Sequence, residues 1–223
     1  MDNAVCRMFG IEIPVFGFSH CRNVIAEITR AGGLGCLGTA YQTPEQLEIE
    51  LRWIDEQVGG RPYGVNLMLP KKFESLGGEK PSFEGLPEGH VRWQRELLDA
   101  AGIPPLPESE RDTLMREELE RLHVTPEHAG ELLDVALRHP NVKLVVSALG
   151  SPPKAILERL RAAGVRVGAM TGAVEHALQH KENGLDLVIA QGTEAAGHTG
   201  VVSSMVLWPA VVAELDDELV EQS

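Results

Sequence analysis

The residues best suited to chemistry lie between Leu185 and Gly200, in the segment LDLVIAQGTEAAGHTG. Its apolar run, Leu187 to Ala190, is typical of a strand buried on both faces of a parallel sheet. A loop with three glycines, one glutamate and one histidine follows that run. Because α/β folds place their chemistry at the carboxyl ends of such strands, His198 is a candidate acid or base that titrates near neutral pH.

Two roles remain open for each polar side chain of this loop. His198 could remove an activated C–H or N–H proton, or it could simply hydrogen-bond to backbone. Glu194 could orient the histidine or contact a ligand hydroxyl, and it could equally cap the turn that follows.

Two amides stand in or beside apolar strands. Asn66 lies between Val65 and Leu67, and Gln191 ends the last apolar run. A buried amide without partners costs about 1–3 kcal/mol, so each must join an internal network or meet a planar hydrogen-bonding ligand. The pyrimidine-like edge of a flavin would suit two such amides.

Three other features of the sequence do not indicate a catalytic or binding site. The glycines of AGGLGCLG, residues 31–38, close a helix and enter a strand, which is the reverse of the dinucleotide-binding order. Cys36 falls in that strand and is predicted to be a core residue. His176 and His180 are four apart on one predicted helix without a third ligand, so we expect a solvated helix face and no zinc.

The elements that position these residues alternate along the chain. Six strand–helix units in series imply a parallel sheet, which either a doubly wound fold or a (β/α)8 barrel would satisfy. Strands are predicted at residues 13–18, 34–37, 64–68, 142–146, 165–170 and 187–190. Helices are predicted at 23–30, 44–58, 126–138, 153–163, 173–182 and 204–215, with Thr43 as the expected N-cap of the second and Pro44 as its first residue.

The chain of 223 residues is long enough for one substantial domain. Residues 70–125 interrupt the alternation and are rich in Pro, Gly and charge. We expect an ordered helical insertion there, serving as a lid or a subunit contact, because Trp93, Leu97, Leu98, Leu114 and Leu119 supply apolar faces. The remaining alternation predicts a single domain over residues 1–223.

Composition narrows the partners and the compartment. A formal charge of −13 argues against a nucleic-acid surface, and no apolar run is long enough to span a bilayer. The start, MDNAVCRMFG, lacks the apolar core of a signal peptide. Three irregularly placed cysteines predict reduced thiols in a cytoplasmic protein.

Four motifs occur in the order seen in a known family: IPVFGFS, AGGLGCLGTA, GVNLMLP and AQGTEAAGHTG. In this order they resemble the nitronate monooxygenases, formerly called 2-nitropropane dioxygenases, which are related to flavin-dependent enoyl-ACP reductases. The last motif is the most specific, since the family typically shows EAGGH-G where this chain has EAAGHTG. Ala196 therefore stands where the family has glycine.

The resemblance implies a TIM barrel that binds FMN at the carboxyl ends of its strands. His198 matches the family's catalytic histidine, which takes the proton α to a nitro group or assists nitronate oxidation by O2. Asn66 and Gln191 match positions that hydrogen-bond the flavin, and Gly192 and Gly197 match backbone near it. A nitronate or nitroalkane would be the substrate, and a homo-oligomer is possible.

The strand count departs from the family. A barrel needs eight strands and six are predicted, so the seventh and eighth, whose loops hold the FMN phosphate, have no counterpart after Trp208. We expect weak FMN binding by this chain alone, unless an oligomer closes the gap, and either a fragment or a natural truncation. The alternatives are an NAD(P)H-dependent flavin reductase of the enoyl-ACP reductase type and a flavin-free remnant that serves as a binding domain.

Overall fold

Six strands form one parallel sheet in the computed structural model, which describes residues 3–69, 87–121, 125–197 and 199–215. The strands are β1 (Phe16–Ser19), β2 (Leu34–Gly38), β3 (Tyr63–Leu67), β4 (Val142–Ser147), β5 (Arg166–Thr171) and β6 (Leu187–Ala190). The helices of these segments are α1 (Ala4–Phe9), α2 (Arg22–Arg30), α3 (Pro44–Val58), α4 (Glu88–Ala100), α5 (Glu108–Arg121), α6 (Pro126–Leu137), α7 (Lys154–Ala162), α8 (Val174–Glu182) and α9 (Ser204–Leu215).

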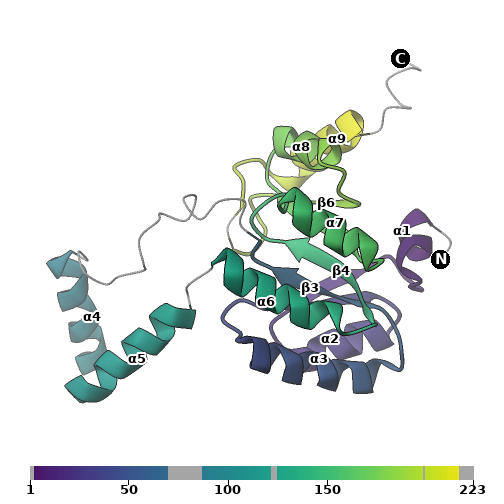
Figure 1. Ribbon diagram of the computed structural model, residues 1–223. Helices are drawn as coiled ribbons and strands as arrows, with labels where there is room; N and C mark the ends of the chain where they lie inside the picture. The colour runs from purple at the N-terminus through teal and green to yellow at the C-terminus, as the bar shows by residue number, and fades with distance from the viewer. Residues whose placement is uncertain (1–2, 70–86, 122–124, 198, 216–223) are drawn as a thin grey trace.

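Strand order decides between the two predicted architectures. Each strand pairs in parallel with the next one along the chain, in the order β1-β2-β3-β4-β5-β6. A doubly wound sheet reverses its order at a switch point, whereas a barrel does not. The sheet therefore has barrel topology, and it curls with its connecting helices on the outer side (Figure 1).

Side chains alternate between the two faces of this curled sheet. On β3, Val65 and Leu67 are fully buried in the core between sheet and helices. The inner face carries the alternate positions, which form a second cluster of Cys6, Phe9, Ile11, Leu34, Cys36, Leu144 and Val146. Helix α1, which the sequence pattern did not predict, supplies Cys6 and Phe9, and Ile11 follows it, so this segment fills the inside of the curl.

Local chemistry explains where elements begin. Thr43 caps α3 as predicted, and its side chain and that of Gln46 form a reciprocal capping box. Strand β1 begins later than predicted, because Pro14 has no N–H and Val15 N bonds to Ile13 O in a tight turn before the strand.

A polar network ties α3 to the amino ends of β3 and β4. Asp55 accepts hydrogen bonds from Tyr63 Oη at 3.1 Å and Asn141 Nδ2 at 2.9 Å, and its other oxygen lies 2.6 Å from His139 Nδ1. Tyr63 is fully buried, and burial together with the Asp55 carboxylate raises the pKa of its phenol. This network lies at the end of the sheet opposite to the predicted site.

Within the predicted insertion, the structure describes two helices, α4 and α5 (Figure 1). Their apolar side chains Trp93, Leu97, Leu98 and Leu114 are all exposed, and the side chain of Leu119 lies outside the described residues. The role of the insertion as a lid or subunit contact stays a prediction.

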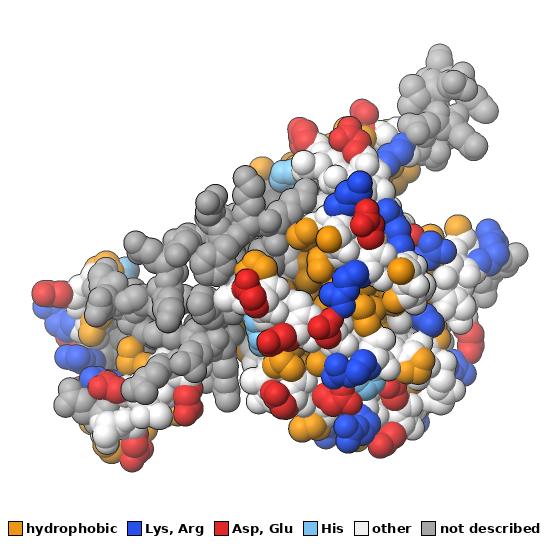
Figure 2. Space-filling model, viewed as in Figure 1, with side chains coloured by type: hydrophobic (Ala, Val, Ile, Leu, Met, Phe, Trp, Pro, Cys, Tyr) orange, Lys and Arg blue, Asp and Glu red, His pale blue; other side chains and the backbone are white. Residues whose placement is uncertain are grey.

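Charges of both signs are interspersed on the face drawn in Figure 2, over α3, α6 and α7. Several are paired there, as in Arg138 with Glu48 and Arg159 with Asp134. Among the helices of the described segments, none is long and apolar enough to cross a membrane.

Candidate functional site

The predicted site residues belong to the carboxyl ends of the strands, which all meet at one edge of the parallel sheet. Asn66 alternates with the helix-facing Val65 and Leu67, so it faces the inside of the curl. Gln191 follows β6 and continues the inward series of Leu187 and Ile189, which pack against the inner cluster. The fold thus brings both amides to the same face and the same end.

Asn66 has a free side-chain amide on that face. Its backbone carbonyl accepts from Thr39 N at 3.3 Å and Thr39 Oγ1 at 2.8 Å, which fixes the strand end. No residue of the described segments hydrogen-bonds the half-buried Asn66 side chain. The described residues therefore do not form an internal network with this side chain, and its role toward a ligand stays a prediction.

Gln191 holds its own loop. Its backbone N–H donates to Thr171 O at 2.8 Å, and its side-chain Nε2 donates to Ala196 O at 3.1 Å. No described residue donates a hydrogen bond to its side-chain oxygen.

The loop after β6 is packed through its glycines. A Cβ on Gly192 would overlap Ser204 N and lie 2.6 Å from Glu194 Oε2, so only glycine fits between them. Gly172 and Gly200 touch backbone to backbone in the same way. Gly197 differs, because its φ is +81° and the space beside its Cα is open. The loop is therefore anchored at Gly192 and Gly200 and open at Gly197.

Glu194 caps the next helix, which was one of its predicted roles. Its carboxylate accepts from Ser204 N at 3.0 Å and from Ser204 Oγ, at the start of α9. Hydrogen bonds from Ser204 Oγ and from its own backbone lower the pKa of Glu194. The described contacts of this carboxylate are thus with the helix start and with Thr193.

Three other predictions have different outcomes. His198 lies outside the described residues, so its role stays a prediction. Cys36 is buried as predicted, and burial raises the pKa of its thiol to about 12. The prediction of a solvated helix face is wrong for His180, which is 3% exposed. Its ring lies 2.7 Å from Ser151 Oγ and 3.2 Å from Met170 O. His176 is exposed, as predicted.

Sequence reasoning missed a histidine at this end of the sheet. His20 directly follows β1 and continues the inward series of Phe16 and Phe18. Its Nδ1 lies 3.1 Å from Gly38 O, and Gly38 pairs in register with Asn66. The alternation F-G-F-S-H was the signal that could have identified it.

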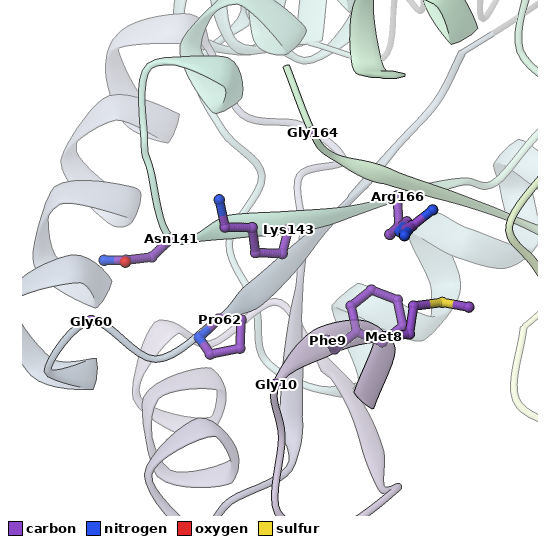
Figure 3. A pocket seen from close by; sticks show the side chains of 9 residues that line it. All are labelled: Met8, Phe9, Gly10, Gly60, Pro62, Asn141, Lys143, Gly164 and Arg166. Carbon is purple, nitrogen blue, oxygen red and sulfur yellow. The ribbon is translucent and has the colours of Figure 1, made fainter. Parts of the chain in front are cut away.

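A cavity of about 440 Å³ lies elsewhere, among the amino ends of the strands (Figure 3). Its lining includes Pro62, Asn141 and Gly164, which precede β3, β4 and β5, together with Phe9 of α1. In Figure 3, Lys143 and Arg166 point in different directions and do not converge. This cavity contains none of the predicted site residues, and it lies at the opposite end of the sheet.

We expect Gly192→Ala to lower the free energy of unfolding by about 3 kcal/mol, because the added methyl group meets backbone and breaks the Glu194 cap. Gly197→Ala is the matched control: its only cost is the left-handed backbone, roughly 1 kcal/mol. Urea unfolding of both variants measures the difference, and equal losses would contradict the anchoring role of Gly192.

The sequence profile of the nitronate monooxygenase family matches residues 7–84 and 101–216. Rv1533 of Mycobacterium tuberculosis, named for monooxygenase activity, is 42% identical over 218 residues, which are 95% of this chain and 56% of that protein. A Staphylococcus aureus protein named for nitronate monooxygenase activity is 26% identical over 202 residues, 89% of this chain and 51% of its own length. This chain therefore spans about half the length of the curated relatives it matches.

Two solved structures share the fold. A nitroalkane oxidase from Streptomyces ansochromogenes aligns with a TM-score of 0.65 and 25% identity, over 96% of this chain and 58% of its own. FabK from Thermotoga maritima aligns with a TM-score of 0.64 and 21% identity, over 96% of this chain and 51% of its own. The profile match extends over most of the sequence in these two segments, and the chain belongs to the nitronate monooxygenase family.

Proposed function

We propose that this chain carries the flavin-facing and proton-transfer side of an FMN-dependent oxidoreductase that oxidises alkyl nitronates or nitroalkanes with O2. The observation that carries the proposal is the free Asn66 amide on the inner face, at the carboxyl end of β3. Family membership supports flavin chemistry at that end of the barrel.

Three features of the described residues support a flavin ring system on this face. Asn66 and Gln191 offer amide groups to its polar edge, and the open backbone at Gly197 allows close approach. The close contact of Gly192 with Ser204 anchors the start of the same loop. When bound, FMN supplies the electron chemistry with the nitronate and O2.

In this proposal the chain's own residues position the substrate and move a proton. His198 accepts the proton from the carbon next to the nitro group, a task suited to a histidine near neutral pH. Because the Glu194 carboxylate is hydrogen-bonded to Ser204, we do not assign it to the orientation of His198.

The test is to titrate the purified chain with FMN and to follow flavin absorbance and fluorescence, then to measure O2 uptake with propyl nitronate. Bound flavin with nitronate-dependent O2 uptake supports the proposal. Anaerobic NAD(P)H oxidation with no nitronate turnover would instead support a flavin reductase. A chain that takes up no FMN would contradict both enzyme functions for these residues.

We expect Asn66→Ala to weaken FMN retention about tenfold, because the ring edge loses one hydrogen bond worth about 1 kcal/mol or more. Asn23→Ala, at an exposed position of α2, is the matched control and should leave FMN affinity unchanged. Fluorescence titration measures both dissociation constants. An unaltered affinity in Asn66→Ala would refute the assigned contact.

A further inference from the structure

His20 is an exposed residue at the carboxyl end of β1, and its ring is held by neighbouring residues. Ser19 Oγ accepts from Cys21 N at 3.0 Å, which fixes the turn that carries the histidine. The ring packs edge-on against Phe18, with centroids 5.2 Å apart and an interplanar angle of 80°. Gly38 leaves room for this pair, since a Cβ there would lie 2.6 Å from His20 Nδ1 and 2.7 Å from Phe18 Cζ.

The contact with Gly38 fixes the tautomer of His20. A backbone carbonyl only accepts hydrogen bonds, so Nδ1, at 3.1 Å from Gly38 O, must carry a proton. The neutral ring then has its lone pair on Nε2, which no residue of the described segments hydrogen-bonds. Any proton that the ring gains therefore goes to Nε2 and turns it into a cationic donor.

Among the described residues, the other inward positions at this end of the sheet carry no cation. Phe18, Gly38, Asn66, Met170 and Gln191 are all uncharged, and the chain as a whole carries a formal charge of −13. An anionic ligand on this face needs a compensating charge or a strong donor.

Neither of the described charged or titratable residues next to His20, Cys21 and Arg22, replaces it as the donor to an anion. Strands β1 and β2 contribute Phe18 and Gly38, and α2 contributes Cys21 as its N-cap and Arg22 as its first residue. Arg22 is directed toward α3, where it lies 3.3 Å from Glu50 Oε1 and 4.7 Å from the Trp53 ring centre.

We propose that His20 is the anion-recognition residue of this face, and that its protonated Nε2 donates a hydrogen bond to an oxygen of the substrate anion. The identification of that anion as a nitronate rests on the proposed function. The role is distinct from proton removal at carbon: His198 as a base accepts a proton, whereas His20 as an anion receptor keeps its proton and donates a hydrogen bond from Nε2.

The variant that isolates this role is His20→Asn. The asparagine amide can still donate to Gly38 O in place of Nδ1, but nothing replaces Nε2. The matched control is His176→Asn, which removes an exposed histidine on α8. Gly38→Ala is a second variant that keeps the histidine and displaces its ring.

The probe is nitrate, a planar anion with the shape of a nitronate head group, titrated into the chain labelled with 15N at histidine. We expect the His20 signals of the free chain to show the Nδ1–H tautomer, and those of the nitrate-bound chain to show protons on both ring nitrogens. His20→Asn and Gly38→Ala should weaken nitrate binding about tenfold, while His176→Asn should leave it unchanged. An Nε2–H tautomer in the free chain, or an unaltered nitrate affinity in His20→Asn, would overturn the proposal.

Kinetics then separate this inference from the proposed function. His20→Asn should raise KM for propyl nitronate about tenfold and leave kcat unchanged. The nitrate titration needs neither flavin nor turnover, so it can succeed when FMN does not bind. Normal nitronate turnover with an unchanged KM in His20→Asn would instead refute the role of His20 and leave the proposed function standing.

Discussion

Turnover of neutral nitroalkanes is expected to fall by about 10²- to 10⁴-fold in His198→Ala, the range typical of a lost general base. The carbon acid must lose its proton before oxidation, and alanine cannot accept it. Preformed nitronates have already lost this proton, so their turnover should change far less. O2 uptake with nitroethane and with ethyl nitronate, measured side by side, gives the ratio that defines the effect.

Retention of flavin in His198→Ala is the necessary companion result. A variant that loses FMN would show that the histidine is structural rather than a base. Glu194→Gln is the matched control from the same loop, because glutamine still accepts a hydrogen bond from Ser204 N at the start of α9. It should leave the nitroethane-to-nitronate ratio unchanged, and a loss equal to that of His198→Ala would indicate damage to the loop.

Most of the fold could be predicted because apolar periodicity and helix caps are local signals. Strand β6 and helix α9 have the bounds that the sequence pattern predicted, and the Thr43 cap is in place. Strand order could not be predicted from spacing, because a doubly wound sheet and a barrel use the same βα unit. The sequential pairing from β1 to β6 shows the barrel topology.

Helix α1 was missed because it is short and because its apolar residues are explained only by tertiary contacts. Its six residues, AVCRMF, have too few turns for a periodic pattern. Phe9 meets Phe16 edge-on at 5.6 Å, and Cys6 and Ile11 join the same inner cluster. Only the curl of the sheet shows why this segment is apolar.

The candidate site was predicted in part. Period-two alternation explains why Asn66 and Gln191 share a face, and their order in the family motifs identified them. His20 was overlooked because a histidine after a strand has no motif of its own. Its role follows from Gly38, which lies beside the ring only after β1 and β2 pair. The Gly38 carbonyl contacts the ring, and the absence of a Gly38 side chain leaves room for it. His180 was misjudged for the same reason, since its partner Ser151 is distant in sequence.

The largest expected loss of stability follows from Asp55→Ala, about 3 kcal/mol or more. One carboxylate accepts from Tyr63 Oη and Asn141 Nδ2 and contacts His139 Nδ1 at 2.6 Å. Alanine leaves all three groups without this partner, two of them on residues less than a tenth exposed. Urea unfolding followed by circular dichroism measures the change, and Glu56→Ala, one position further along α3 and exposed, should be nearly neutral.

The same network predicts that the free energy of unfolding decreases at alkaline pH, which gives its pH profile an alkaline limb. Burial and Asp55 raise the pKa of Tyr63 in the folded state, so the protonated phenol is favoured by folding. The contribution to stability is complete below the unfolded phenol pKa of about 10 and is lost as the pH rises above it. Tyr63→Phe should abolish this limb, because phenylalanine has no proton to lose. If Asp55→Ala unfolds no more easily than Glu56→Ala, and Tyr63→Phe keeps the alkaline limb, the network does not stabilise the junction of α3 with β3 and β4.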